Sequence, residues 1–226
     1  MRARKLILIT LLILATVPAL AQPRARRVVV THGSHGGQPS PFSLVVEGAA
    51  VLPQGDLGDD FIGTDKGLGA GTGFELGGRL RYRVTPQTSV GPAVHWADFG
   101  DWDDVFDDGV DLVPYYVRTS VLRVGLDLQQ FFGQPDARLR PYLTAGVALY
   151  HNRYEDWVEG EGVFTTSSNN LGLAAGVGVA TGPVELSAVW NYNPVKNRQL
   201  PGGAGSTDDS FDWSYVAIRA GLVFGG

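Results

Sequence analysis

The feature that most constrains this chain is a strict period-two alternation of apolar and polar side chains. It is clearest between residues 70 and 84, where Phe74, Leu76, Leu80, Tyr82 and Val84 alternate with Glu75, Arg79, Arg81 and Arg83. A helix would scatter these residues around its surface, whereas a strand sorts them onto two faces. The segment therefore predicts a β-strand with one apolar face and one charged face.

Seven further segments repeat this alternation between turn signals. The eight predicted strands span residues 42–52, 70–84, 89–99, 115–128, 141–152, 170–180, 184–192 and 213–224. Segments of this length suit tilted membrane-spanning strands. Near Arg118 the alternation breaks, which predicts a bulge or the point where the chain leaves the membrane. The predicted fold class is all-β, an eight-stranded antiparallel up-and-down transmembrane β-barrel over residues 42–226.

The predicted connections alternate in length along the chain. Three are shorter, at 85–88, 129–140 and 181–183, and four are longer, at 53–69, 98–114, 154–168 and 193–212. Short periplasmic turns and long outside loops are typical of outer-membrane barrels. With an even number of strands, this pattern places both termini in the periplasm.

The first residues predict export across the inner membrane. Basic residues are followed by an apolar run from Leu6 to Val17 and then by Ala19-Leu20-Ala21, the order of a secretory signal peptide. We expect a signal peptide at 1–21 that is cleaved near Ala21, and a polar periplasmic lead-in at 22–41. The sequence has no cysteine, so no disulfide is expected.

Charge argues against a nucleic-acid partner. The formal net charge is −5, and loss of the basic signal peptide makes the remaining chain more acidic. Proteins that bind nucleic acid carry a basic balance. We therefore expect no nucleic-acid binding.

Alternation alone does not tell which face points inward, because a soluble ligand-binding barrel has an apolar interior. Here the charged face also carries small residues such as Gly172, Ala174 and Gly176, which suit the crowded inside of a narrow barrel. Its acids and bases nearly balance, as a buried ion-pair network requires. The predicted interior charge network consists of Glu47, Glu75, Arg79, Arg81, Arg83, Arg123, Asp127, Glu185 and Arg219.

The segments Pro141–Tyr150, with its Pro-Tyr start, and Leu171–Gly178, together with the aromatic-ended last strand, resemble a known family. The family is the small outer-membrane β-barrel domains related to OmpA, OmpX and OmpW, and the resemblance spans residues 42–226. It implies roles that range from structural anchor, adhesin or stress-linked surface protein to a conduit for small apolar solutes. The family's last strand usually ends the chain on an aromatic that the barrel-insertion machinery reads, whereas here Phe224 is followed by two glycines.

An acidic loop supplies the candidates for a metal site. Its carboxylates could bind a divalent cation, although their spacing does not fit an EF-hand loop and a solvated loop is the plainer interpretation. The candidates are Asp101, Asp103, Asp104, Asp107 and Asp108. A contact surface for a partner around Trp102 and Phe106 is a further alternative.

Catalysis is not expected. His32-Gly33-Ser34 has the His-x-Ser spacing that some outer-membrane deacylases use, but it lies in the lead-in and not on a strand. A nucleophile needs a base within hydrogen-bond reach on a rigid element. No enzyme activity and no cofactor are therefore predicted.

The leading hypothesis is a non-enzymatic integral outer-membrane β-barrel protein with a structural or surface-display role and long extracellular loops. A narrow channel or transporter for small or apolar solutes is one alternative, and a soluble secreted ligand-binding barrel is another. The expected partners are outer-membrane lipid, lipopolysaccharide and the barrel-insertion machinery, and the chain is expected to be a monomer.

Overall fold

The computed structural model describes residues 40–59, 69–100, 102–107, 112–158, 162–196 and 210–225. The predicted signal peptide and nearly all of the lead-in lie outside these residues. So do Asp101, Asp108 and the His32-Gly33-Ser34 segment. The predicted boundaries at residues 21 and 41 therefore stay predictions.

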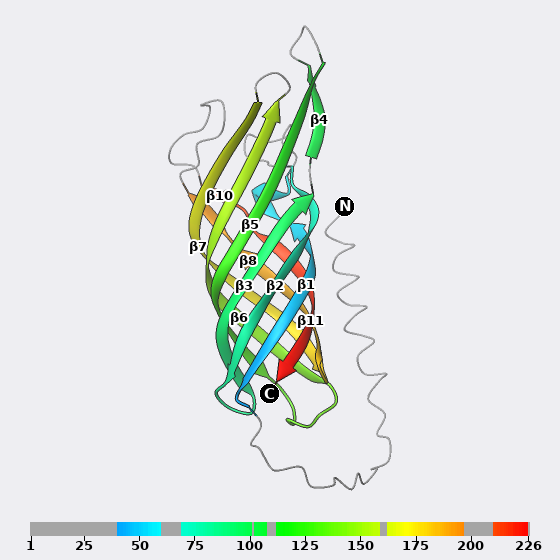
Figure 1. Ribbon diagram of the computed structural model, residues 1–226, viewed down its shortest axis with the longest axis vertical. Coiled ribbons are helices and arrows are strands. Elements are labelled where there is room, and N and C mark those ends of the chain that lie inside the picture. Colours follow the sequence, from blue (N-terminus) through cyan, green and yellow to red (C-terminus); the bar gives the residue numbers. More distant parts are fainter. Residues whose placement is uncertain are drawn as a thin grey trace. The chain divides into compact units, whose positions relative to one another are not determined.

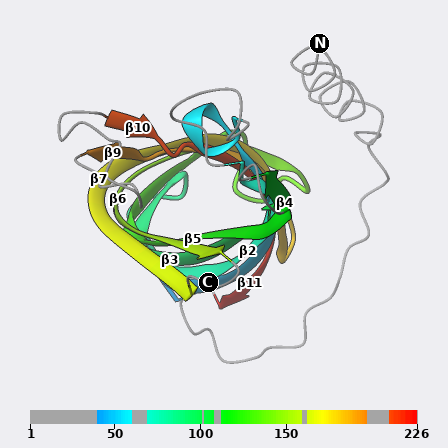
Figure 2. The ribbon, with the colours of Figure 1, turned by 90° about the horizontal axis from the view of Figure 1, so that it is seen from above.

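In this part of the chain, eight long antiparallel strands close a barrel (Figures 1 and 2). They are β1 (Phe42–Pro53), β2 (Gly71–Arg83), β3 (Thr88–Gly100), β5 (Leu112–Phe131), β6 (Arg140–Val158), β7 (Gly162–Thr181), β8 (Val184–Tyr192) and β11 (Tyr215–Gly225). Neighbours in sequence pair with one another, β11 pairs with β1, and β3 pairs with β5. Because every strand has two partners, the predicted eight-stranded antiparallel barrel is confirmed.

Three short strands and one short helix complete the described elements. β4 (Trp102–Asp107) pairs with β5 beyond the end of β3. β9 (Pro194–Lys196) and β10 (Ser210–Asp212) form a small separate sheet, and η2 (Gly55–Leu57) is a single 3-10 turn. No helix within the described ranges is long and apolar enough to cross a membrane.

The barrel has two different ends. Segments 84–87, 132–139 and 182–183 connect strands at one end, which we call the short-turn end. Gly182 has a φ of 56° there, a left-handed conformation that glycine adopts without strain. Ser43 pairs with Gly225, so the start of β1 and the end of β11 lie at this end too. The other end is the long-loop end.

Two of the predicted long loops are largely strand. β6 and β7 pair continuously from Arg140–Ala180 to Val158–Gly162, and β4 and β5 occupy most of residues 98–114. The predictions of loops at 98–114 and 154–168 were therefore wrong. The physical reason is that β7 carries serine, threonine and asparagine here, and both faces are exposed or half-buried, so no apolar alternation marks the strand.

The bulge expected near Arg118 is not in β5 itself but in the chain segment that pairs with this part of β5. β5 pairs with β6 without a shift from Tyr115 to Phe131. On its other edge, Asp98 pairs with Ser120 but Trp102 pairs with Val117. The register therefore shifts by one residue between Asp98 and Trp102.

Candidate functional site: the barrel interior and its two faces

The outward face of the barrel is apolar. Leu171 is 65% exposed and Leu149 is 61% exposed, and many other large apolar side chains are similarly uncovered. Inward neighbours such as Glu47 and Arg123 are buried. A continuous apolar surface of this kind suits hydrocarbon rather than water. The soluble-barrel alternative needs the opposite arrangement, so that alternative was wrong.

Aromatic side chains gather at two levels of this outward face. Phe42 and Tyr82 contact each other near the short-turn end, with ring centroids 5.1 Å apart. Phe74 and Trp96 contact each other toward the long-loop end, at 5.5 Å. Along β2, Phe74 and Tyr82 are separated by about 26 Å at roughly 3.3 Å per residue, or about 20 Å along the axis at a tilt near 40°. This is comparable with the apolar band of ~25 Å between the aromatic girdles of membrane barrels.

The interior is crossed by ion pairs, and some of them join strands that are not neighbours. Arg79 Nη2 on β2 donates to Glu47 Oε1 on β1 at 2.7 Å and to Glu185 Oε2 on β8 at 3.0 Å. Arg81 Nη1 donates to the other oxygen of Glu185 at 2.5 Å. Because β1 and β11 lie between β2 and β8, the contacts to Glu185 span the lumen rather than follow the wall.

The same chain of contacts continues across the barrel. Glu47 Oε2 lies 2.9 Å from Nε2 of His95 on β3. The Nδ1 of His95 lies 3.2 Å from Arg123 Nη1 on β5, and Arg123 also pairs with Asp127. Seven side chains, Arg81, Glu185, Arg79, Glu47, His95, Arg123 and Asp127, therefore form one connected network.

A second buried cluster lies beside it. Arg219 Nε on β11 donates to Glu75 Oε1 on β2 at 2.7 Å, and the Tyr215 hydroxyl donates to the same carboxylate at 3.4 Å. Each of these three side chains is at most 2% exposed. The carboxylate is thereby held by one charged and one neutral donor.

Of the nine residues predicted for the interior charge network, eight lie buried inside the barrel. These are Glu47, Glu75, Arg79, Arg81, Arg123, Asp127, Glu185 and Arg219. Arg83 differs, because β2 ends at this residue and its side chain is exposed at the short-turn end, with no ion pair to any residue the structure describes. His95 belongs to the network but was not predicted. Its position on the inward face of β3, among small residues, could have indicated that His95 lies in the interior.

Glycines make room for large interior side chains. The pairing of these glycines with the large side chains was also not predicted. Gly77 faces His95, Gly146 faces Asp127 and Gly178 faces Tyr142 directly across the ladder. A Cβ atom would lie 2.3 Å from the His95 ring, 2.2 Å from Asp127 Oδ1 and 2.4 Å from the Tyr142 ring. At these three positions, a bulky or charged inward side chain on one strand is therefore paired with a glycine on the next strand.

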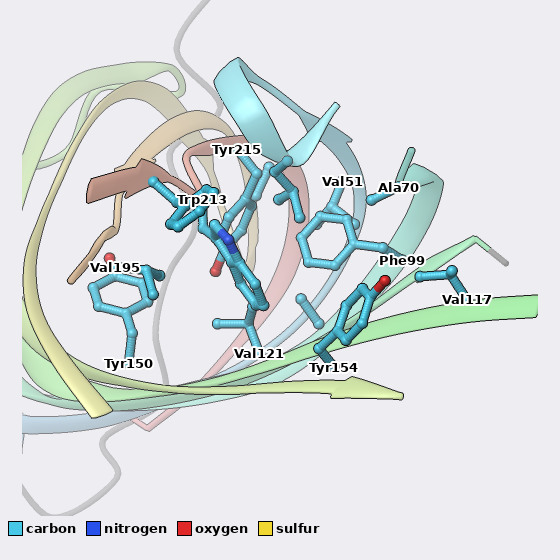
Figure 3. Packing of buried hydrophobic residues seen from close by; sticks show 14 of the residues in the cluster. Val51, Ala70, Phe99, Val117, Val121, Tyr150, Tyr154, Val195, Trp213 and Tyr215 are labelled. Atoms are coloured by element: carbon cyan, nitrogen blue, oxygen red, sulfur yellow. The ribbon is translucent and has the colours of Figure 1, made fainter. Parts of the chain in front are cut away.

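Toward the long-loop end the interior becomes aromatic (Figure 3). Trp213, Tyr215, Phe99 and Tyr154 belong to one buried cluster, and the rings of Phe99 and Tyr215 meet edge to face at 5.4 Å. Leu57 of η2 is fully buried in the same cluster. Residues outside the eight long strands thus help to fill the lumen, and no periodic pattern in the sequence indicated this layer.

The acidic segment lies partly in a strand. Asp103, Asp104 and Asp107 lie on β4 rather than in a loop, while Asp101 and Asp108 lie outside the described residues. Among the side chains that the structure describes, which do not include those of β4, no group of three or more histidine or acidic residues could hold a metal ion. The cation site stays a prediction.

Comparison with known proteins finds similarity in fold only. No family profile matches this sequence, and neither does any curated protein. Neisserial surface protein A is 20% identical, with 83% of this chain and 98% of that chain covered and a TM-score of 0.46. The outer membrane protein OprG from Pseudomonas aeruginosa is 14% identical, covers 84% and 99%, and has a TM-score of 0.44. A major outer membrane protein from Thermus thermophilus is 16% identical, covers 81% and 99%, and has a TM-score of 0.46.

Proposed function

We propose that this chain is a non-enzymatic integral outer-membrane protein whose closed barrel anchors a protruding sheet at the cell surface. The observation that carries the proposal is the combination of an apolar outward face with a lumen crossed by ion pairs. Arg79 and Glu185 meet across the barrel at 3.0 Å, where a path for solutes would have to run. A side-chain-filled interior is usual for eight-stranded barrels.

The display part of the proposal rests on unequal strand lengths. β5, β6 and β7 have 20, 19 and 20 residues, whereas β8 has 9 and β1 has 12. The pairing of Trp96 with Leu122 and of Leu122 with His151 places His151 in ladder register with the upper aromatic residue Trp96. Residues 152–158 then extend roughly 23 Å further along the strand. Figure 1 shows β5, β6 and β7 rising beyond the other long strands.

Solute uptake tests the closed interior. Reconstituted into lipid vesicles, the unchanged chain should give no swelling in arabinose. The double variant Arg81→Ala/Glu185→Ala removes one cation and one anion, leaves Arg79 paired with Glu47, and should give measurably more swelling in arabinose than the unchanged chain. Equal and substantial swelling of the vesicles with both proteins would refute the closed interior.

Epitope placement tests orientation and display. A short epitope inserted at 159–161, between β6 and β7, should bind antibody on intact cells. A matched epitope in the 132–139 turn should bind antibody only after the outer membrane is permeabilised. The reverse pattern would contradict the proposed orientation, and labelling of neither epitope in a folded protein would contradict display.

An opening beside the glycine-rich part of β7 would favour the channel alternative. β7 pairs with β8 continuously from Leu173 to Thr181, and with β6 continuously from Gly162 to Ala180. The backbone ladder therefore leaves no gap beside Gly176 and Gly178, and no described feature favours lateral passage there.

A further inference from the structure

A cavity of about 290 Å³ opens at the short-turn end, where Arg81 and Glu185 of the ion-pair network form part of its lining and no residue of the aromatic layer does. Its walls come from the short-turn ends of all eight long strands and from the three turns at 84–87, 132–139 and 182–183. The volume lies near the lower limit of roughly 300 Å³ for small-molecule sites. It has room for a small polar group rather than a large apolar ligand.

The charged side chains that line the cavity are unequal in number and in pairing. Arg81, Arg83 and Arg140 line it together with Asp136 and Glu185. Glu185 is already engaged by two arginines, Arg79 and Arg81. Arg83 and Arg140 therefore face only one further carboxylate, that of Asp136, and the cavity carries an excess of positive charge.

Two buried donors in the wall have no hydrogen-bond partner within the described part of the chain. One is the hydroxyl of Ser89, a residue that is only 6% exposed, and the other is Nε of Arg140. The rest of the Arg140 guanidinium is held in place, because Nη2 donates to the Pro86 carbonyl at 3.0 Å and the group lies over the Phe131 ring at 4.7 Å. Unsatisfied buried donors are costly, which favours an acceptor in the cavity.

We infer that this cavity is a binding site for a phosphate group, with Arg83 and Arg140 as its cationic contacts and Ser89 as its neutral donor. Planar guanidinium groups bind phosphate oxygens in pairs, and these hydrogen bonds are roughly twice as strong as neutral ones. A carboxylate has only two oxygens to share among two guanidinium groups and a hydroxyl. Phosphate offers more acceptors to donors that converge from β2, β3 and β6.

The phosphate can come from free phosphate or from a phospholipid headgroup, so the titration has two arms. The full chain in a non-ionic detergent and a phosphate-free buffer is titrated with inorganic phosphate, and separately with short-chain phosphatidylglycerol, by calorimetry. Arg83→Gln removes the cationic contact from Arg83, whose side chain makes no ion pair within the described ranges. Arg140→Lys keeps the charge and the turn while removing the planar fork. Arg153→Gln, an exposed arginine at the long-loop end, is the matched control.

We expect Arg83→Gln and Arg140→Lys each to weaken binding by about tenfold or more, and Arg153→Gln to leave it unchanged. Binding of both titrants assigns a general phosphate site, whereas binding of the lipid alone assigns a headgroup site. Heat-dependent gel mobility shows that each variant is folded. Absence of binding by both titrants, or binding that Arg83→Gln leaves unchanged, would overturn the inference.

Discussion

The sharpest stability prediction concerns Asp127, which is the carboxylate bound to the fully buried guanidinium of Arg123. Asp127→Asn keeps the side-chain size and removes the charge, so Arg123 is left with three uncharged partners, His95, the Tyr150 hydroxyl and the new amide. Removing one partner of a buried ion pair costs about 3–5 kcal/mol. The cost should lie near the upper limit, because Arg123 is 0% exposed and cannot turn toward water.

Glu185→Gln gives the comparison within the same network. Arg79 keeps its ion pair with Glu47 at 2.7 Å after this substitution, and Arg81 Nη1 still donates to the side-chain Oε1 of Gln129 at 3.2 Å. The Arg81 side chain is also 10% exposed. We therefore expect a loss of about 3 kcal/mol, at the lower limit of the same range. The predicted order of destabilisation is Asp127→Asn, then Glu185→Gln.

Urea unfolding in lipid vesicles, followed by tryptophan fluorescence and by heat-dependent gel mobility, measures both losses. Asp136→Asn, in an exposed turn, should change stability by no more than about 0.5 kcal/mol. The double variant Arg123→Met/Asp127→Leu removes both charges and should recover much of the loss of Asp127→Asn. A loss below about 1 kcal/mol for Asp127→Asn would refute the idea that Asp127 neutralises Arg123.

Two further substitutions test the wall of the barrel. Leu126→Lys places a charge on the outward face between the aromatic levels and should cost about 2–4 kcal/mol in vesicles, whereas Phe164→Lys on the protruding part of β7 should cost close to nothing. Equal costs would contradict a lipid boundary between these positions. Gly146→Val brings a side chain against Asp127 and should abolish the heat-dependent gel shift, while the outward-facing neighbour Ala145→Val should keep it. A normal shift for Gly146→Val would show that the interior is loosely packed there.

The sequence was most informative where the two faces of a strand meet different surroundings. In β2 the alternation of Leu80 and Tyr82 with Arg79 and Arg81 predicted both the strand and its inward face. The same reasoning gave eight strands and their antiparallel order, since consecutive strands joined by turns form a meander. These predictions follow from a period of two residues, which is local in the sequence.

Other features could not be predicted from a pattern that is local in the sequence. The partners of Glu185 lie on β2, which is three places away in the barrel, and nothing in the sequence states that offset. The protruding half of β7 was also missed, because Thr165 to Asn170 shows no apolar face outside the hydrocarbon region. The aromatic layer depends on Trp213 and Leu57, which lie outside the long strands.

The change from charged to aromatic interior follows from what surrounds each level of the barrel. Where hydrocarbon covers the outside of the barrel, burial of apolar side chains in the interior adds little stability. These side chains would otherwise contact lipid, which is equally apolar. Ion pairs such as Arg79–Glu185 specify the strand register there. A register slip of one residue would point every arginine of β2 toward lipid. Beyond the upper aromatic level the strands meet water, and burial of Trp213 and Tyr215 then stabilises the fold by the ordinary hydrophobic effect. Substitutions in the aromatic layer should therefore lower stability equally in detergent and in vesicles, whereas slips in the charged layer are penalised most strongly in lipid.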